Sequence, residues 1–192
     1  MQSCLCVAAL TMLAACASPM PPIATEQEFA RWAAEERGRQ TAFAEFTGAL
    51  RDHDLWIVDR LEACCVEATF VAPPRDEWRN IIATLRFIRD HVEPAIGEVR
   101  AVSAYRDEAF NVCIGGAPAS AHRSFYAVDL VPLDPAVTRE RLVETLCAVH
   151  ARDGERFGVG LGIYAARRFH IDTRSFRGWG ADHRRVSFPC DA

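Results

Sequence analysis

Residues 120–130 read SAHRSFYAVDL, in which His122 and Asp129 stand seven positions apart. Residues 127–130 are typical of the start of a strand, so one candidate ligand ends a loop and the next lies on the strand that follows. His170 lies in a second short β segment, FHID at residues 169–172. Two imidazoles and one carboxylate leave a fourth position for water, which is the donor set of a catalytic zinc site. Spacing alone is a weak signal, because His/Asp pairs are common.

The apolar pattern around this stretch predicts an α+β domain, with helices packed on a small antiparallel sheet. Helices are expected over residues 25–51, over 78–92 up to Pro94, and from Thr138 to near Gly154. Strands are expected over 99–103, 126–131, 158–164 and 168–173, and the last two could form a hairpin. We expect a helical N-terminal arm at 25–69 and the main domain at 70–192.

The first residues read as an export signal. Leu5 to Leu13 is an apolar run of signal-peptide length, too short to span a bilayer. It ends in LAAC at residues 13–16, which resembles the lipobox of bacterial lipoproteins, whose cysteine is acylated. The expected result is a signal peptide at 1–15, a tether at 16–24 lipidated on Cys16, and a lipid anchor in the outer membrane facing the periplasm. Because no Arg or Lys precedes the run, a frayed apolar N-terminus with a chance cysteine is the alternative.

The composition excludes several function classes. The 192 residues contain no lysine, so a phosphate-binding P-loop, a Schiff-base lysine and an S-x-x-K serine site are all ruled out. The net charge of −4 gives no basic footprint, so no nucleic-acid partner is expected. No C-x-x-C pair is present, and one or two disulfides are expected in an oxidising compartment.

Several ordered motifs around the His/Asp pair resemble the zinc D-Ala-D-Ala carboxypeptidase family, which shares its fold with the hedgehog signalling domain. The family signature S-x-H-x-x-G-x-A-x-D is matched by Ser120, His122, Ala127 and Asp129. The other matching motifs are SAYR at 103–106, Asn111, GGAPASAH at 115–122, Pro73-Pro74 with Trp78, and FHIDTR at 169–174. The resemblance covers roughly residues 70–180.

The resemblance implies an active-site zinc held by His122, Asp129 and His170. In that family a zinc-activated water attacks an amide next to a D-amino acid, so the expected partners of this chain, as a monomer, are peptidoglycan stem peptides. Arg106 matches the Tyr-Arg arginine of the family, and it would bind a substrate carboxylate or a developing oxyanion. A surface pair of Arg106 with its acidic neighbours at 107 and 108 is the alternative. Ser120 is expected to contact substrate.

Two positions depart from the family pattern. Phe125 replaces the signature glycine, which predicts strain if that position needs positive φ, and the ring could narrow the cleft. Arg167 stands where many relatives carry an acidic general base, three residues before His170. Asp172 lies on the same strand face as His170, and it is either the base or a residue that orients a ligand. The other four histidines are expected at the surface or at helix caps: His53, His91, His150 and His183.

These departures leave two alternatives to a peptidase open. One is a zinc-containing but inactive module that binds peptidoglycan. The other is a purely structural envelope lipoprotein whose His/Asp pair is accidental.

Overall fold

The structure is a computed structural model, and it describes residues 73–191 together with Glu28, Arg31 and Ala34. Those three isolated positions are helical. The expected helix over 25–51 otherwise lies outside the described residues, as do Cys16, the signal peptide and the boundary at residues 69 and 70.

The first helical segment runs from residue 75 to residue 96. It consists of the 3₁₀ helix η3 (Arg75–Asn80), α3 (Ile81–Phe87), the π-helical turn η4 (Ile88–Val92) and α4 (Glu93–Ile96). The expected end at Pro94 is wrong by two residues. Pro94 lies in the first turn of α4, directly after the π-helical turn η4, and Gly97 at φ 85° ends the segment.

The second helical segment consists of α6 (Arg139–Val149), the π-helical turn η6 (His150–Gly154) and α7 (Glu155–Phe157). Thr138 begins it as predicted, because its Oγ1 accepts a hydrogen bond from Arg141 N at 3.3 Å. The segment continues three residues past the expected end near Gly154 and stops at Gly158, which takes the left-handed conformation.

Five strands form one sheet in the order β1-β2-β4-β3-β5. Their bounds are β1 (Val99–Ser103), β2 (Ala127–Pro132), β3 (Gly160–Ile163), β4 (Phe169–Asp172) and β5 (Arg177–Trp179). The α+β class and the hairpin of β3 with β4 are confirmed. The expectation of a wholly antiparallel sheet is wrong, because β5 runs parallel to β3 along its outer edge.

Four short helical elements complete the described chain. They are α5 (Glu108–Cys113), η5 (Ala121–Ser124), η7 (Arg185–Ser187) and η8 (Pro189–Asp191). Throughout the described residues, every helix falls short of the length and apolarity that a membrane span requires.

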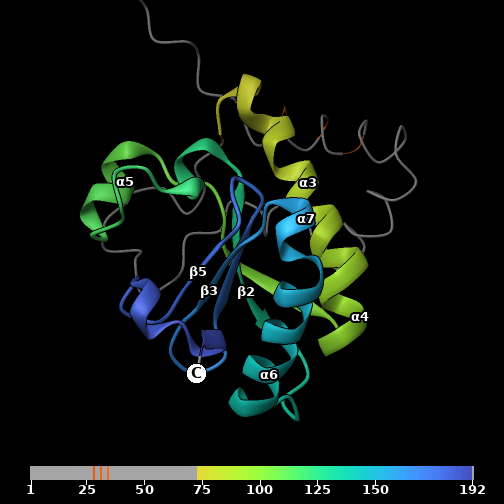
Figure 1. The fold of residues 1–192 in the computed structure, drawn as a ribbon. Coiled ribbons are helices and arrows are strands. Elements are labelled where there is room, and N and C mark those ends of the chain that lie inside the picture. Colours follow the sequence, from red (N-terminus) through yellow and green to blue (C-terminus); the bar gives the residue numbers. More distant parts are fainter. Residues whose placement is uncertain (1–27, 29–30, 32–33, 35–72, 192) are drawn as a thin grey trace, which may run out of the picture.

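The two faces of the sheet have different roles. Helices α3, α4, α6 and α7 lie together on one side, and α5 lies on the other (Figure 1). Strand side chains alternate between faces, so apolar residues of β2 and β4 join the helices in the hydrophobic core: Val128, Leu130, Phe169 and Ile171. Asp129, His170 and Asp172 occupy the alternate positions and therefore point to the opposite face.

Candidate metal centre and cleft

Strand register brings two of the three predicted ligands together. Asp129 on β2 and His170 on β4 are directly opposite partners in the antiparallel ladder. His122 arrives from η5, the turn of 3₁₀ helix that precedes β2, where Ser120 Oγ accepts a hydrogen bond from His122 N at 3.3 Å. All three ligand candidates are buried, with 1–3% of their surface exposed.

Three donor atoms surround one point. His122 Nε2 lies 3.2 Å from Asp129 Oδ1 and 3.1 Å from His170 Nδ1. His170 Nδ1 lies 2.9 Å from Asp129 Oδ1. Zinc–ligand bonds of about 2.0–2.1 Å in a tetrahedron place ligand atoms about 3.3 Å apart. The observed spacings differ from this by only a few tenths of an ångström. The group therefore fits a zinc ion with little rearrangement of its side chains.

The far nitrogen of each imidazole fixes which nitrogen is free for a metal. His122 Nδ1 donates to the carbonyl oxygen of Ala104, which leaves the lone pair of Nε2 for the centre. His170 Nε2 donates to Asp172 Oδ2 at 2.8 Å, which leaves Nδ1 for the centre. A metal-binding histidine is commonly oriented in this way by a carboxylate or a carbonyl.

The protonation states in the metal-free protein follow from burial and neighbouring charges. Burial, with Arg106 nearby, lowers the pKa of His122 to about 4. Burial disfavours the cation of His170 as well, but hydrogen bonds to Asp129 and Asp172 outweigh it and raise the pKa of His170. Against burial, the two histidines hold the pKa of Asp129 well below its usual range. A metal ion must therefore displace a proton from His170.

Two arginines hold the outer oxygen of the carboxylate ligand. Arg106 Nη2 and Arg168 Nη2 donate to Asp129 Oδ2, at 2.9 Å and 2.7 Å, while Oδ1 faces the histidines. Arg106 Nε also donates to Ser103 Oγ at 3.1 Å. The alternative surface pair for Arg106 is not observed, because its guanidinium is buried and Asp107 instead caps α5. Nothing in the sequence pattern indicated Arg168.

Both carboxylate oxygens of Asp172 accept hydrogen bonds. Oδ2 accepts from His170 and, at 2.6 Å, from Arg177 Nη2. Oδ1 accepts from Arg177 Nη1 at 3.0 Å and from Arg174 N at 2.9 Å. Although burial opposes it, these bonds to His170 and Arg177 lower the pKa of Asp172. Asp172 is fully buried and does not line the cleft, so its geometry matches the orienting alternative better than the base.

Two glycines of β3 leave room for this arrangement. Gly160 and Gly162 lie directly opposite Asp172 and His170. A Cβ atom at Gly160 would overlap the Asp172 carboxylate and the Arg177 guanidinium, and one at Gly162 would lie 2.6 Å from the Trp179 ring. Side chains from β5 can therefore cross β3 and support the residues on β4.

The centre lies at the floor of a cleft of about 1000 Å³. One wall is built from small residues of the segment 115–121, and the other from residues 177–185 with Tyr164. Asp129 is the one carboxylate among the described lining residues, whereas four of them are arginines: Arg106, Arg168, Arg177 and Arg185. This charge balance favours an anionic ligand.

Phe125 takes the left-handed conformation, with φ 51° and ψ 37°, so the strain predicted for this position is present. The predicted narrowing of the cleft is wrong. The ring is fully buried in the hydrophobic core, edge-on to Tyr105 with ring centres 6.3 Å apart.

The sequence pattern did not indicate the surroundings of three more residues. Arg167 donates to the carbonyl oxygens of Asp134 and Val137, away from the centre. His150, expected at the surface or at a cap, is buried and bonds to the carbonyl oxygen of Val159. His183 is exposed as expected, but it lines the cleft.

The donor set and the cleft fit a zinc metallopeptidase, and the comparison with protein families supports that class. The model of the family Peptidase M15 matches residues 58–172, more than half of the chain. The chain therefore belongs to the Peptidase M15 family, the zinc D-Ala-D-Ala carboxypeptidase family whose motifs it carries. Comparison with curated proteins and comparison with solved structures found no match.

Proposed function

We propose that this protein hydrolyses amide bonds next to D-amino acids in peptidoglycan stem peptides or cross-links. The observation that carries the proposal is the convergence of His122 Nε2, Asp129 Oδ1 and His170 Nδ1 at the floor of an arginine-lined cleft. Stem peptides carry free carboxylates, which suits that charge. The family assignment supports peptide hydrolysis, and the ordered motifs from Ser103 to Arg174 support the peptidoglycan substrate.

His122, Asp129 and His170 would hold a zinc ion, which would supply a water of lowered pKa and a Lewis acid for a carbonyl group. The protein's own residues prepare the site for that chemistry. His122 Nε2 and His170 Nδ1 are turned toward the centre because the Ala104 carbonyl and the Asp172 carboxylate accept hydrogen bonds from the other ring nitrogens. In this proposal Asp172 orients His170 and does not exchange protons with substrate.

Arg106 is positioned to stabilise negative charge on the substrate. Its guanidinium is fixed by Ser103 and Asp129, so little reorganisation is needed when charge develops on a carbonyl oxygen nearby. Ser120 lines the same cleft, although its Oγ also caps η5. We assign both residues to substrate binding.

The proposal also includes the location of the protein. The LAAC motif at residues 13–16 supports acylation of Cys16 and a periplasmic protein attached to the outer membrane. We propose that it acts there as a monomer.

A second candidate function is binding of peptidoglycan without turnover. One observation favours it. Arg167 replaces the acidic residue expected before His170, and the described lining residues supply no carboxylate except the ligand Asp129.

Digestion of purified peptidoglycan by the zinc-loaded full chain tests both candidates. The peptidase proposal predicts new fragments in mass spectra, lost on chelation, restored by added zinc, and absent with His170→Ala. Protein that sediments with peptidoglycan but releases no fragment supports the binding function. Protein that neither binds nor cleaves contradicts both.

A further inference from the structure

The segment that follows β5 forms part of the cleft wall. Ala181, His183 and Arg185 all line the cleft. The family match ends at Asp172, so this wall lies in sequence that the family model does not cover. We call residues 180–190 the C-terminal wall.

A tight turn shapes the C-terminal wall. Gly180 N donates to the carbonyl oxygen of Arg184 at 3.1 Å, and His183 N donates to that of Gly180 at 3.0 Å. A Cβ atom at Gly180 would overlap the backbone of Ser187. His183 takes φ 61°, a conformation that is strained for a non-glycine residue and persists where the surrounding structure enforces it.

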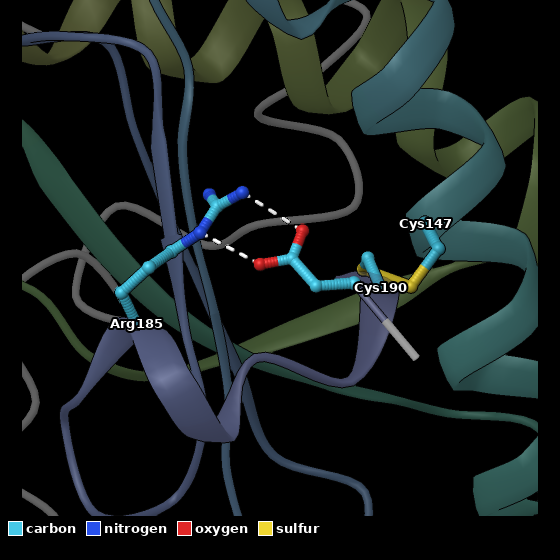
Figure 2. The surroundings of a disulfide bond; sticks show 4 residues. Cys147, Arg185 and Cys190 are labelled. Atoms are coloured by element: carbon cyan, nitrogen blue, oxygen red, sulfur yellow. Dashed lines mark hydrogen bonds and ion pairs between the residues drawn. A yellow bond between two sulfur atoms is a disulfide. The ribbon is translucent and has the colours of Figure 1, made fainter.

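Three contacts anchor the end of the wall. The Phe188 ring is buried against Gly178, where a Cβ atom would overlap it. Arg185 lies over that ring, with its guanidinium carbon 5.1 Å from the ring centre. Cys190 forms a disulfide with Cys147 on α6, which ties the wall to the helical layer (Figure 2).

Asp191, next to Cys190, binds the guanidinium of Arg185. Its Nη2 donates to Asp191 Oδ1 at 2.8 Å, and its Nε lies 2.7 Å from Asp191 Oδ2. Within the described part of the chain Nη1 forms no hydrogen bond, so it remains available to a ligand. The ring centres of His183 and Tyr164 lie 5.3 Å apart, and His183 is exposed.

We propose that the C-terminal wall is a substrate-binding element, in which Arg185 and His183 receive a carboxylate of the bound peptide. The Cys147–Cys190 disulfide holds them in place. This inference rests on the proposed function for the identity of the peptide. The metal ligands come from η5, β2 and β4 and not from the wall, so loosening the wall changes peptide affinity and leaves metal binding intact.

Zinc-loaded full-length protein and a stem pentapeptide ending in D-Ala-D-Ala test the proposal. The variants are Arg185→Gln, His183→Gln and the double variant Cys147→Ser/Cys190→Ser, with Arg156→Gln as control because Arg156 stacks on Phe157 away from the cleft. The disulfide is removed by serine substitution and not by a thiol reductant. A reductant would also break the disulfide of Cys113, and thiols bind zinc.

For Arg185→Gln and the double variant we expect about tenfold weaker peptide binding by calorimetry, and a similar rise in KM. For His183→Gln we expect a smaller loss in the same direction. Zinc stoichiometry and kcat stay within about twofold of wild type, as does every parameter of the control. Hydrogen exchange within residues 180–190 becomes faster in the double variant only.

The outcomes separate this proposal from the proposed function. Wild type that cleaves the peptide, with variants that bind it equally well, overturns the C-terminal wall alone. Wild type that binds without cleaving, with variants that bind more weakly, supports the wall and contradicts the peptidase. Wild type that neither binds nor cleaves contradicts both. If the double variant fails to fold, the two single variants decide.

Discussion

His170 Nε2 lies 2.8 Å from Asp172 Oδ2, on the same face of the same strand. Because Arg177 and the backbone of Arg174 hold the remaining lone pairs of Asp172, the carboxylate is fixed and the imidazole is fixed with it. The free nitrogen of His170 is thereby directed at Asp129 and His122. Several predictions about the centre depend on this pair.

Asp172→Asn is expected to weaken zinc binding about 10- to 100-fold, because the amide replaces one of the two acceptor oxygens that His170, Arg174 and Arg177 donate to with an NH2 donor. Activity should return in part with added zinc. Competition with a chelator measures the affinity, and Asp153→Asn, which alters a pair with His91 outside the cleft, is the control. Unchanged zinc affinity with near-complete loss of turnover would instead identify Asp172 as the base.

Arg106→Lys is expected to lower kcat/KM by about 10²-fold, the scale of a lost oxyanion donor. Lysine keeps the charge but lacks the planar fork whose Nε and Nη2 donate to Ser103 and Asp129. Zinc affinity should change little, because Arg168 still donates to Asp129 Oδ2. Arg123→Lys serves as the control, since Arg123 contacts Pro118 and Glu108 outside the cleft lining. Peptidoglycan digestion at the wild-type rate would remove Arg106 from the mechanism.

Phe125 allows a test of the strain at the signature glycine position. Phe125→Ala is expected to cost about 3–5 kcal/mol in the free energy of unfolding, because the ring is fully buried. Phe125→Gly should cost about 1 kcal/mol less than the alanine variant, because glycine takes φ 51° without strain. Urea unfolding measures both. A glycine variant less stable than the alanine variant would show that the conformation is not strained.

Zinc affinity should fall as the pH is lowered, because a proton competes with zinc for His170. The pKa of His170 is raised from its ordinary value and that of His122 is lowered to about 4, so in mildly acidic solution zinc competes with a proton at His170 and not at His122. Binding then releases about one proton, and affinity falls about tenfold for each unit of pH. Calorimetry in buffers of different ionisation enthalpy counts the proton. Release of none, or of two, would contradict this protonation scheme.

The anchor is tested separately from the centre. Expressed in a Gram-negative host, the wild-type protein should fractionate with the outer membrane and incorporate labelled fatty acid, and Cys16→Ser should do neither. Equal labelling of both forms would refute acylation at Cys16.

The ligands could be predicted from the sequence because the pattern around them is local. Alternation along a strand places Asp129 on the face opposite the core, and His170 follows the same rule on its own strand. Their meeting depended on register, and the family motifs supplied that information. The core helices of the described residues followed from apolar periodicity, which ended them too early at Pro94 and at Gly154.

The residues around the ligands could not be predicted in the same way. Strand β5 has three residues, too few to show alternation, so the support that Arg177 and Trp179 give to β4 was hidden. Arg168 donates to Asp129 from the end of the turn that precedes β4. His183 lines the cleft because its own backbone is left-handed and because residues distant in the sequence hold its segment in place. These positions are set by tertiary structure that no short motif encodes.

The zinc content of purified protein tests the central claim most directly. Native mass spectrometry of the wild type should show one zinc ion per chain, removed by a chelator and rebound on addition of zinc. His170→Ala should lose most of it, whereas His91→Gln should keep it, because His91 pairs with Asp153 outside the cleft. Folded wild-type protein that shows no affinity for zinc, or a His170→Ala variant that binds it as tightly, would contradict the account.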